Sequence, residues 1–294
     1  MIGTKTKAYL QLCRPPNLPT AAADNMAGMA IAGAFITQEA FNPRYLFLIV
    51  ASVALYAGGV VLNDVFDIDV DTRERPHRPI PSGSVPLKEA RLFGYGLLAL
   101  GVAAASLVQL IALITAMGLS TAIVFYNAGA KHSRFFGPFT MGLCRGLNLL
   151  LGLTVLGSGA YGYYAAIPLV FIFAVTTISQ GEVYGNNRSS LLISGVLYAL
   201  VIILTGYCNQ LQTDPNILSW VLLLVFALMV LFPLAQAYKN NTPQNIQKAV
   251  KFGVLSLIVL DAAMAAAHTS WFVALLILAL LPLSLWLAKI FAVT

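Results

Sequence analysis

Four aspartates and an asparagine lie within nine residues, from Asn63 to Asp71, directly after an apolar stretch of about twenty residues. If the preceding helix continues through this segment, each residue turns it by about 100°, so Asp64, Asp67 and Asp71 share one face within about 60°. Asn63 lies about 40° further round, and Asp69 points to the opposite side. Carboxylates on one helix face repel one another. The spacing therefore predicts a cation between them.

The donor set of this segment favours Mg²⁺. It offers oxygen ligands without histidine or cysteine, and Mg²⁺ prefers oxygen, keeps several waters and usually completes its shell with substrate phosphates. Arg73, Arg75 and Arg78 follow at once, and the planar fork of arginine suits phosphate oxygens. We therefore expect a phosphorylated substrate. The alternative is a solvated loop whose acids and bases merely neutralise one another; the position beside an apolar span argues against it, because ionisable groups there are costly.

The composition is that of an integral membrane protein. Of 294 residues, 59% are hydrophobic and 10% are charged, which is too apolar for an ordinary soluble domain. A spanning helix needs about twenty apolar residues, and we predict an all-α single domain, 1–294, of nine or ten transmembrane helices, with 271–291 as a possible extra C-terminal helix. The candidate spans begin near Leu18, Tyr45, Leu92, Leu113, Phe139, Ala165, Leu191, Ile217, Val250 and Trp271.

The basic residues predict the orientation. Of the 17 lysines and arginines, this arrangement places only Arg44 on the opposite side and only Arg145 well within a span. The positive-inside rule then puts both termini and the aspartate segment in the cytoplasm of a multi-pass cell-membrane protein. The net charge of +6 requires no nucleic acid, because anionic lipid head groups or an anionic substrate on the cytoplasmic face are enough.

The aspartate segment resembles the first signature of the UbiA superfamily of intramembrane prenyltransferases, N-D-x-x-D-x-x-x-D. The following "RPHRPIPSG" and "YNAGAK", from Tyr126 to Lys131, are also similar to segments of that family. The resemblance implies a helical bundle around a central cavity, in which Mg²⁺ joins two acidic motifs to the diphosphate of a polyprenyl donor. The allylic carbon to oxygen bond then ionises, and a lipophilic acceptor, aromatic or lipid-like, attacks the carbocation. The residues matching the signature are Asn63, Asp64, Asp67 and Asp71.

The resemblance also implies roles for residues outside this signature. The family's second acidic motif, D-x-x-x-D, corresponds to "SQGEVYGNN", where Glu182 and Asn186 keep the spacing but the second carboxylate is an amide. We expect these two residues to form a reduced second metal site, with Glu182 also catalytic. Residues expected to contact the substrate are Arg78, Lys131, Tyr126, Arg73 and Arg188.

Two further segments, Arg14–Gly33 and Asn241–Ala263, resemble a UbiA-like branch called EboC. For this branch the resemblance implies the fold more firmly than any substrate. The altered second motif leaves open a fold that has lost catalysis and binds or transports an isoprenoid or another hydrophobic metabolite. A cation transporter ranks below both, because the aspartates lie at the membrane face and coupling sites usually lie near the midplane.

Polar residues also lie inside the predicted spans, where charge is expensive. Arg145 could face the cavity and assist in binding the diphosphate or the acceptor, and Asp24 could orient an acceptor group. Alternatively these residues, together with Asn148 and Asp261, pair between helices and stabilise the bundle.

Overall fold

The structure, a computed structural model, describes residues 4–35, 42–156, 161–182, 188–212 and 216–291, and these ranges form helices and turns without strands. The first half contains α1 (Thr4–Leu12), η1 (Pro15–Asn17), α2 (Leu18–Ile31), α3 (Pro43–Phe66), α4 (Ile68–Glu74), α5 (Leu87–Ser106), α6 (Leu110–Ala128), η2 (Ala130–His132) and α7 (Phe136–Leu153). The second half contains η3 (Thr154–Leu156), η4 (Gly162–Ala165), α8 (Ala166–Ser179), α9 (Arg188–Gln210), α10 (Ile217–Lys239), α11 (Pro243–His268), α12 (Trp271–Leu278) and α13 (Leu280–Ile290).

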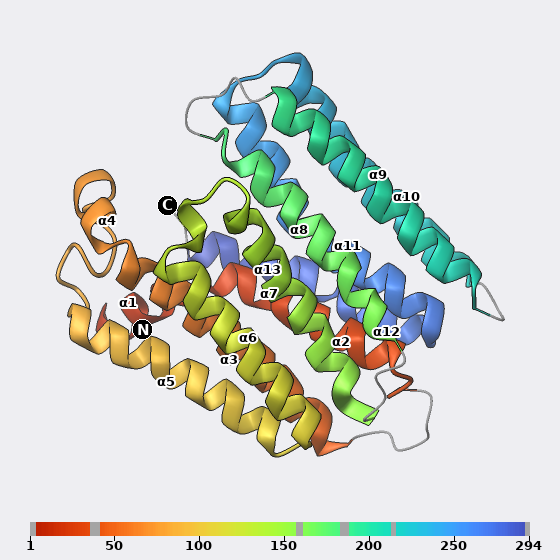
Figure 1. Ribbon diagram of the computed structural model, residues 1–294, viewed down its shortest axis with the longest axis horizontal. Coiled ribbons are helices and arrows are strands. Elements are labelled where there is room, and N and C mark those ends of the chain that lie inside the picture. The colour runs from red at the N-terminus through yellow and green to blue at the C-terminus, as the bar shows by residue number, and fades with distance from the viewer. Residues whose placement is uncertain (1–3, 36–41, 157–160, 183–187, 213–215, 292–294) are drawn as a thin grey trace.

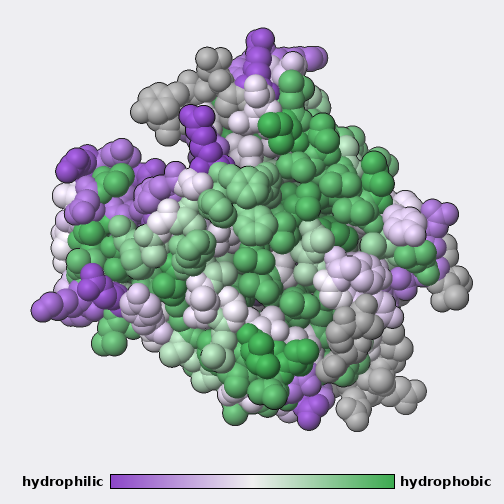
Figure 2. All heavy atoms as spheres, viewed as in Figure 1, coloured by the Kyte–Doolittle hydropathy of each residue, from purple (hydrophilic) through white to green (hydrophobic). Residues whose placement is uncertain are grey.

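The long helices run side by side in one bundle, and α4, the start of α1 and the end of α13 lie at the same end of it (Figure 1). Eight segments in the described ranges are long and apolar enough to cross a membrane. The helices α2 and α5 occupy the places of the two other predicted spans, so the predicted helical membrane fold is confirmed. Apolar side chains cover the middle of the visible face, and polar ones gather toward its edges (Figure 2).

Local sequence determines where several spans begin. Asn42 caps α3 by accepting a hydrogen bond from the backbone N–H of Arg44, and Pro43 stands at the first helical position, where its missing N–H costs nothing. The same combination recurs at α11, where Thr242 accepts from the N–H of Asn245 before Pro243. These caps satisfy backbone donors that would otherwise face the membrane surface unpaired.

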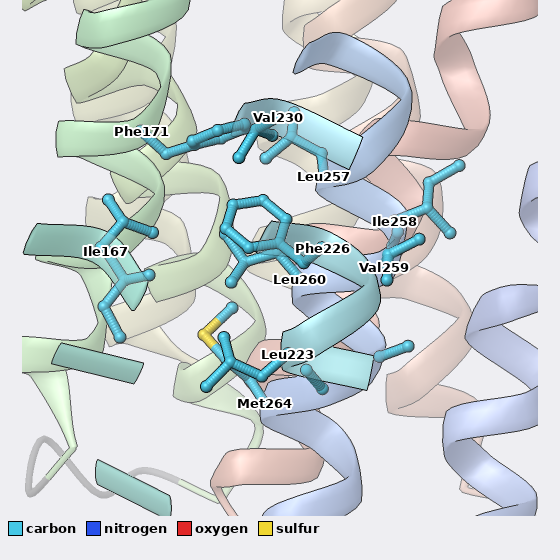
Figure 3. Close-up of a cluster of buried hydrophobic side chains, with 14 of the residues drawn as sticks. Ile167, Phe171, Leu223, Phe226, Val230, Leu257, Ile258, Val259, Leu260 and Met264 are labelled. Carbon is cyan, nitrogen blue, oxygen red and sulfur yellow. The ribbon is translucent and has the colours of Figure 1, made fainter. Parts of the chain in front are cut away.

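The core of the second half is apolar and closely packed. Phe171 of α8, Phe226 of α10 and Leu260 of α11 point toward one another (Figure 3), and all three are fully buried. The rings of Phe171 and Phe226 meet edge to face with centroids 5.1 Å apart, a favoured aromatic geometry. This packing holds α8, α10 and α11 together.

In the first half, α2 and α7 touch at their backbones. A Cβ added at Gly28 would collide with the carbonyl oxygen of Leu149, and one added at Gly152 would collide with that of Asn25. Small residues allow such close approach of membrane helices. The contact matters for the site, because α7 and α2 carry the polar residues that the sequence placed inside the spans.

We predict that Gly152→Ala lowers the free energy of unfolding by about 1–3 kcal/mol, the usual cost of overpacking, because the new methyl group must push α2 from α7. Gly118→Ala in α6 is the control, since an added Cβ there meets nothing within 4 Å. The measurement is thermal unfolding in detergent. Equal melting temperatures for the two variants would contradict the close contact.

Candidate active site

The aspartate segment forms the junction between α3 and α4. The helix loosens at Asp67, whose φ of −91° and ψ of 9° end α3, but the i to i−4 hydrogen bonds continue across it. The N–H of Asp67 donates to the carbonyl of Asn63 at 3.0 Å, and that of Asp71 donates to the carbonyl of Asp67 at 2.8 Å. Asp64 and Asp71 therefore remain on one side, as the spacing predicts.

Arginine side chains lie between these carboxylates. Asp64 accepts from Arg14 at 2.8 Å and from Arg78 at 3.3 Å, and the same Arg78 nitrogen donates to Asp71 at 2.7 Å. Arg75 adds a longer ion pair with Asp71, at 3.6 Å. Both aspartates are buried, so their charges need partners. In this structure the guanidinium group of Arg78 lies between the carboxylates of Asp64 and Asp71 and supplies positive charge there.

Asp67 differs from the other two aspartates. Its carboxylate lies 2.6 Å from the ammonium of Lys131 in η2. Among the described residues, no three acidic, histidine or cysteine side chains lie close enough to hold a metal by themselves. The expectation that Asp64, Asp67 and Asp71 share one Mg²⁺ stays a prediction, in which Asn63 and substrate phosphates supply the remaining oxygen ligands.

A cavity of about 210 Å³ adjoins the junction, between α3, α6, α7 and Arg14. Its outer end, next to the aspartates, is lined by Arg14, Asn63 and Tyr126. Asn63 is held there by α6, because its amide donates to the side-chain oxygen of Asn127 at 3.2 Å. Tyr126 thus lines the same cavity as Asn63 of the signature, and its expected substrate contact stays a prediction.

The inner end of the cavity is polar, and Ser52, Tyr56, Arg145 and Asn148 line it. Arg145 donates to the carboxylate of Asp24 at 2.8 Å and to the hydroxyl of Thr20 at 2.8 Å. Asp24 is fully buried and does not line the cavity. The predicted pairing between helices is thus present, and Arg145 also lines the cavity; the ligand-binding roles of Arg145 and Asp24 stay predictions.

Of the second motif the structure describes Glu182, and it also describes the remaining basic residues of the expected site, Arg73 and Arg188. Burial raises the pKa of the Glu182 carboxyl above its ordinary value, and the positive charge of Arg75, which follows the first motif, opposes that shift. Arg73 is exposed on α4. Arg188 instead lies over the ring of Tyr238, 5.9 Å from its centroid, and is directed toward α10. Asn186 lies outside the described residues.

Arg14 is the residue that sequence reasoning missed. It combines an ion pair to Asp64 with a place in the cavity lining. Its φ of +47° is uncommon for a residue with a side chain, and such conformations cluster at functional sites. A signal existed, because "RPP" places an arginine just before the first span. The sequence could not indicate the partner of Arg14, since Asp64 lies fifty residues further along the chain.

Comparisons with known proteins agree with this arrangement. Residues 26–181 match the UbiA prenyltransferase family. A digeranylgeranylglyceryl phosphate synthase of Saccharolobus solfataricus is 28% identical over 175 residues, covering 59% of this chain and 61% of the relative. One of Methanopyrus kandleri is 37% identical over 174 residues, covering 59% and 60%. The matches thus span about three fifths of these relatives.

Solved structures show the same fold. A structure concerning digeranylgeranylglyceryl phosphate synthase aligns with a TM-score of 0.69 at 24% identity, covering 90% of this chain and 99% of its own. A UbiA homologue from Archaeoglobus fulgidus bound to GPP and Mg²⁺ aligns with a TM-score of 0.69 at 18% identity, covering 87% and 99%. Membership of the EboC branch stays a prediction. Because the family match covers more than half of its residues, the chain belongs to the UbiA prenyltransferase family.

Proposed function

We propose that this protein is a Mg²⁺-dependent prenyltransferase that moves a prenyl group from a polyprenyl diphosphate to a lipophilic acceptor. The observation that carries the proposal is the convergence of Arg14, Arg78 and Lys131 on the signature carboxylates, beside a largely apolar cavity. Relatives named digeranylgeranylglyceryl phosphate synthase support a prenyl donor. The active site faces the cytoplasm, because most basic residues precede or follow the spans at the end where α4 lies.

The signature residues fit Mg²⁺ by their chemistry, since all of them offer oxygen. Asn63, Asp64, Asp67 and Asp71 would hold it, with Glu182 and Asn186 as the reduced second site. Bound Mg²⁺ supplies positive charge that stabilises the departing diphosphate.

The chain's own residues perform the remaining steps. Arg14, Arg78 and Lys131 bind the diphosphate oxygens and stabilise the negative charge that develops as the allylic carbon to oxygen bond breaks. The cavity excludes water from the allylic cation, and the ring of Tyr126 at the outer end of the cavity stabilises it by cation–π attraction. An electron pair of the acceptor then forms the new bond to the allylic carbon, and the departed diphosphate takes up the proton that the acceptor releases.

Thermal unfolding with geranylgeranyl diphosphate tests donor binding. A ligand that binds only the folded protein adds about 2.7 kcal/mol at 100 times its dissociation constant, and we expect this gain only when Mg²⁺ is present. Asp67→Asn is expected to lose it. A gain without turnover would favour the carrier function instead, and no gain with any prenyl diphosphate would refute a donor site.

A further inference from the structure

The inner end of the cavity lies too deep to serve the diphosphate. Tyr56 precedes Asn63 by seven residues on α3, which at 1.5 Å per residue is about 10 Å along the helix. Arg145 of α7 faces Tyr56, with its guanidinium carbon 4.9 Å from the ring centroid. Both residues line the cavity. The donor site at the outer end leaves this second group of polar side chains without a role.

The charge of Arg145 is already neutralised. Asp24 accepts a hydrogen bond from it at 2.8 Å, and Asp261 of α11, also fully buried, lies beside Asp24. Two carboxyl groups therefore lie behind one guanidinium. An anion that entered the inner end would meet no excess positive charge, and it would lose its hydration without compensation. The inner end consequently favours an uncharged ligand.

The inner end nevertheless offers hydrogen-bond donors. A guanidinium carries five N–H groups. The hydrogen bonds of Arg145 run from Nη1 to Asp24 and from Nη2 to Thr20, which leaves donors for a ligand in the cavity. Stacking on Tyr56 and the hydrogen bond to Asp24 already hold the guanidinium in place, so binding a ligand costs little further conformational entropy of this side chain. The hydroxyl of Tyr56 supplies a second polar group.

The size of the cavity restricts what can enter. Its volume of about 210 Å³ exceeds the roughly 150 Å³ that admits benzene in an apolar protein cavity. The whole cavity, with no donor in it, therefore admits a single six-membered ring with a short substituent, whereas a head group with several charged substituents does not match the charge of its inner end.

We propose that Arg145 and Tyr56 form an acceptor-binding site that holds an uncharged hydroxyl or carbonyl oxygen on a ring-sized head group. This oxygen anchors the acceptor about 10 Å from the outer end along α3, so that another atom of the acceptor reaches the prenyl cation. The inference rests on the proposed transferase function and adds the class of acceptor: neutral at its inner end, rather than a phosphate or a carboxylate.

Binding of three size-matched probes tests this site without donor or Mg²⁺. The probes are 4-propylphenol, propylbenzene and 4-propylbenzoate, titrated by calorimetry into the detergent-purified protein. We expect the phenol to bind at least about tenfold more tightly than either of the others, because only the phenol brings a neutral oxygen to the donors. Tyr56→Phe and Arg145→Lys are each expected to reduce this advantage to about threefold or less.

Tyr198→Phe is the matched control, because Tyr198 is another buried tyrosine and does not line the cavity; it should keep the full advantage. Equal affinity for phenol and propylbenzene, tightest binding of the benzoate, or an advantage that survives both cavity variants would each overturn the proposal. If Arg145→Lys does not fold, Tyr56→Phe decides, since it removes a single oxygen atom. The Mg²⁺-dependent gain with geranylgeranyl diphosphate is measured on the same samples, so a failed donor site is distinguished from a failed acceptor site.

Discussion

Asp67→Asn is expected to slow prenyl transfer by roughly 10²- to 10³-fold, the usual cost of removing one charge-stabilising group from a transition state. The amide keeps the size of the carboxylate but removes the charge that binds metal. Asp67 is also the most accessible of the three signature carboxylates, with 24% of its side chain exposed, so the structure should tolerate the change. The measurement is diphosphate released from geranylgeranyl diphosphate, with a membrane lipid extract as the source of acceptor.

Asp69→Asn is the control for this prediction. Asp69 lies two residues away and is exposed on α4, on the face that the spacing places opposite the site. Its replacement removes the same charge from the same short helix and is expected to leave the rate within about twofold, as for surface substitutions in general. Similar rates for the two variants would show that the signature carboxylates do not act in transfer.

The sequence predicted the positions of the spans well, because about twenty apolar residues leave a chain few alternatives in a bilayer. The helix α10 begins at Ile217 and α12 at Trp271, where the apolar stretches begin. The caps at Asn42 and Thr242 could also be inferred locally, since an N-cap depends on neighbours in the sequence. These features follow from interactions over a few residues or from hydropathy alone.

The site was only partly predictable, because its contacts join residues that are far apart in the chain. The spacing placed Asp64 and Asp71 on one face, but their shared partner Arg78 and the capture of Asp64 by Arg14 depend on how a loop and the first span fold back. We expected Asp67 to share one face with Asp64 and Asp71, whereas its ion pair with Lys131 depends on where α6 ends. Charge pairing between distant segments is set by packing and leaves no periodic signal in the chain.

The polar residues inside the spans show the same limit. Their cost in a membrane predicted that they pair or function, but 121 residues separate Asp24 from Arg145, so the sequence could not join them. The structure also explains how a single residue can both pair between helices and face the cavity. Asp24 is fully buried, whereas Arg145 extends from it to the cavity wall. An arginine that serves a ligand in this environment needs a buried counter-ion, and Asp24 provides it.

Arg145→Leu is therefore expected to lower the free energy of unfolding by about 3–5 kcal/mol, the usual cost of leaving a buried charge without its partner. Removing both charges, with Arg145→Leu and Asp24→Ala together, should restore much of that loss, because no buried charge is then left without a partner. The measurement is unfolding of the single and double variants in detergent, arranged as a double-mutant cycle. If the losses of the two single variants simply add, Asp24 does not stabilise the guanidinium. A double variant that recovers its stability yet binds no phenol would separate the two roles of Arg145, since folding needs only a matched pair and the acceptor site needs the guanidinium itself.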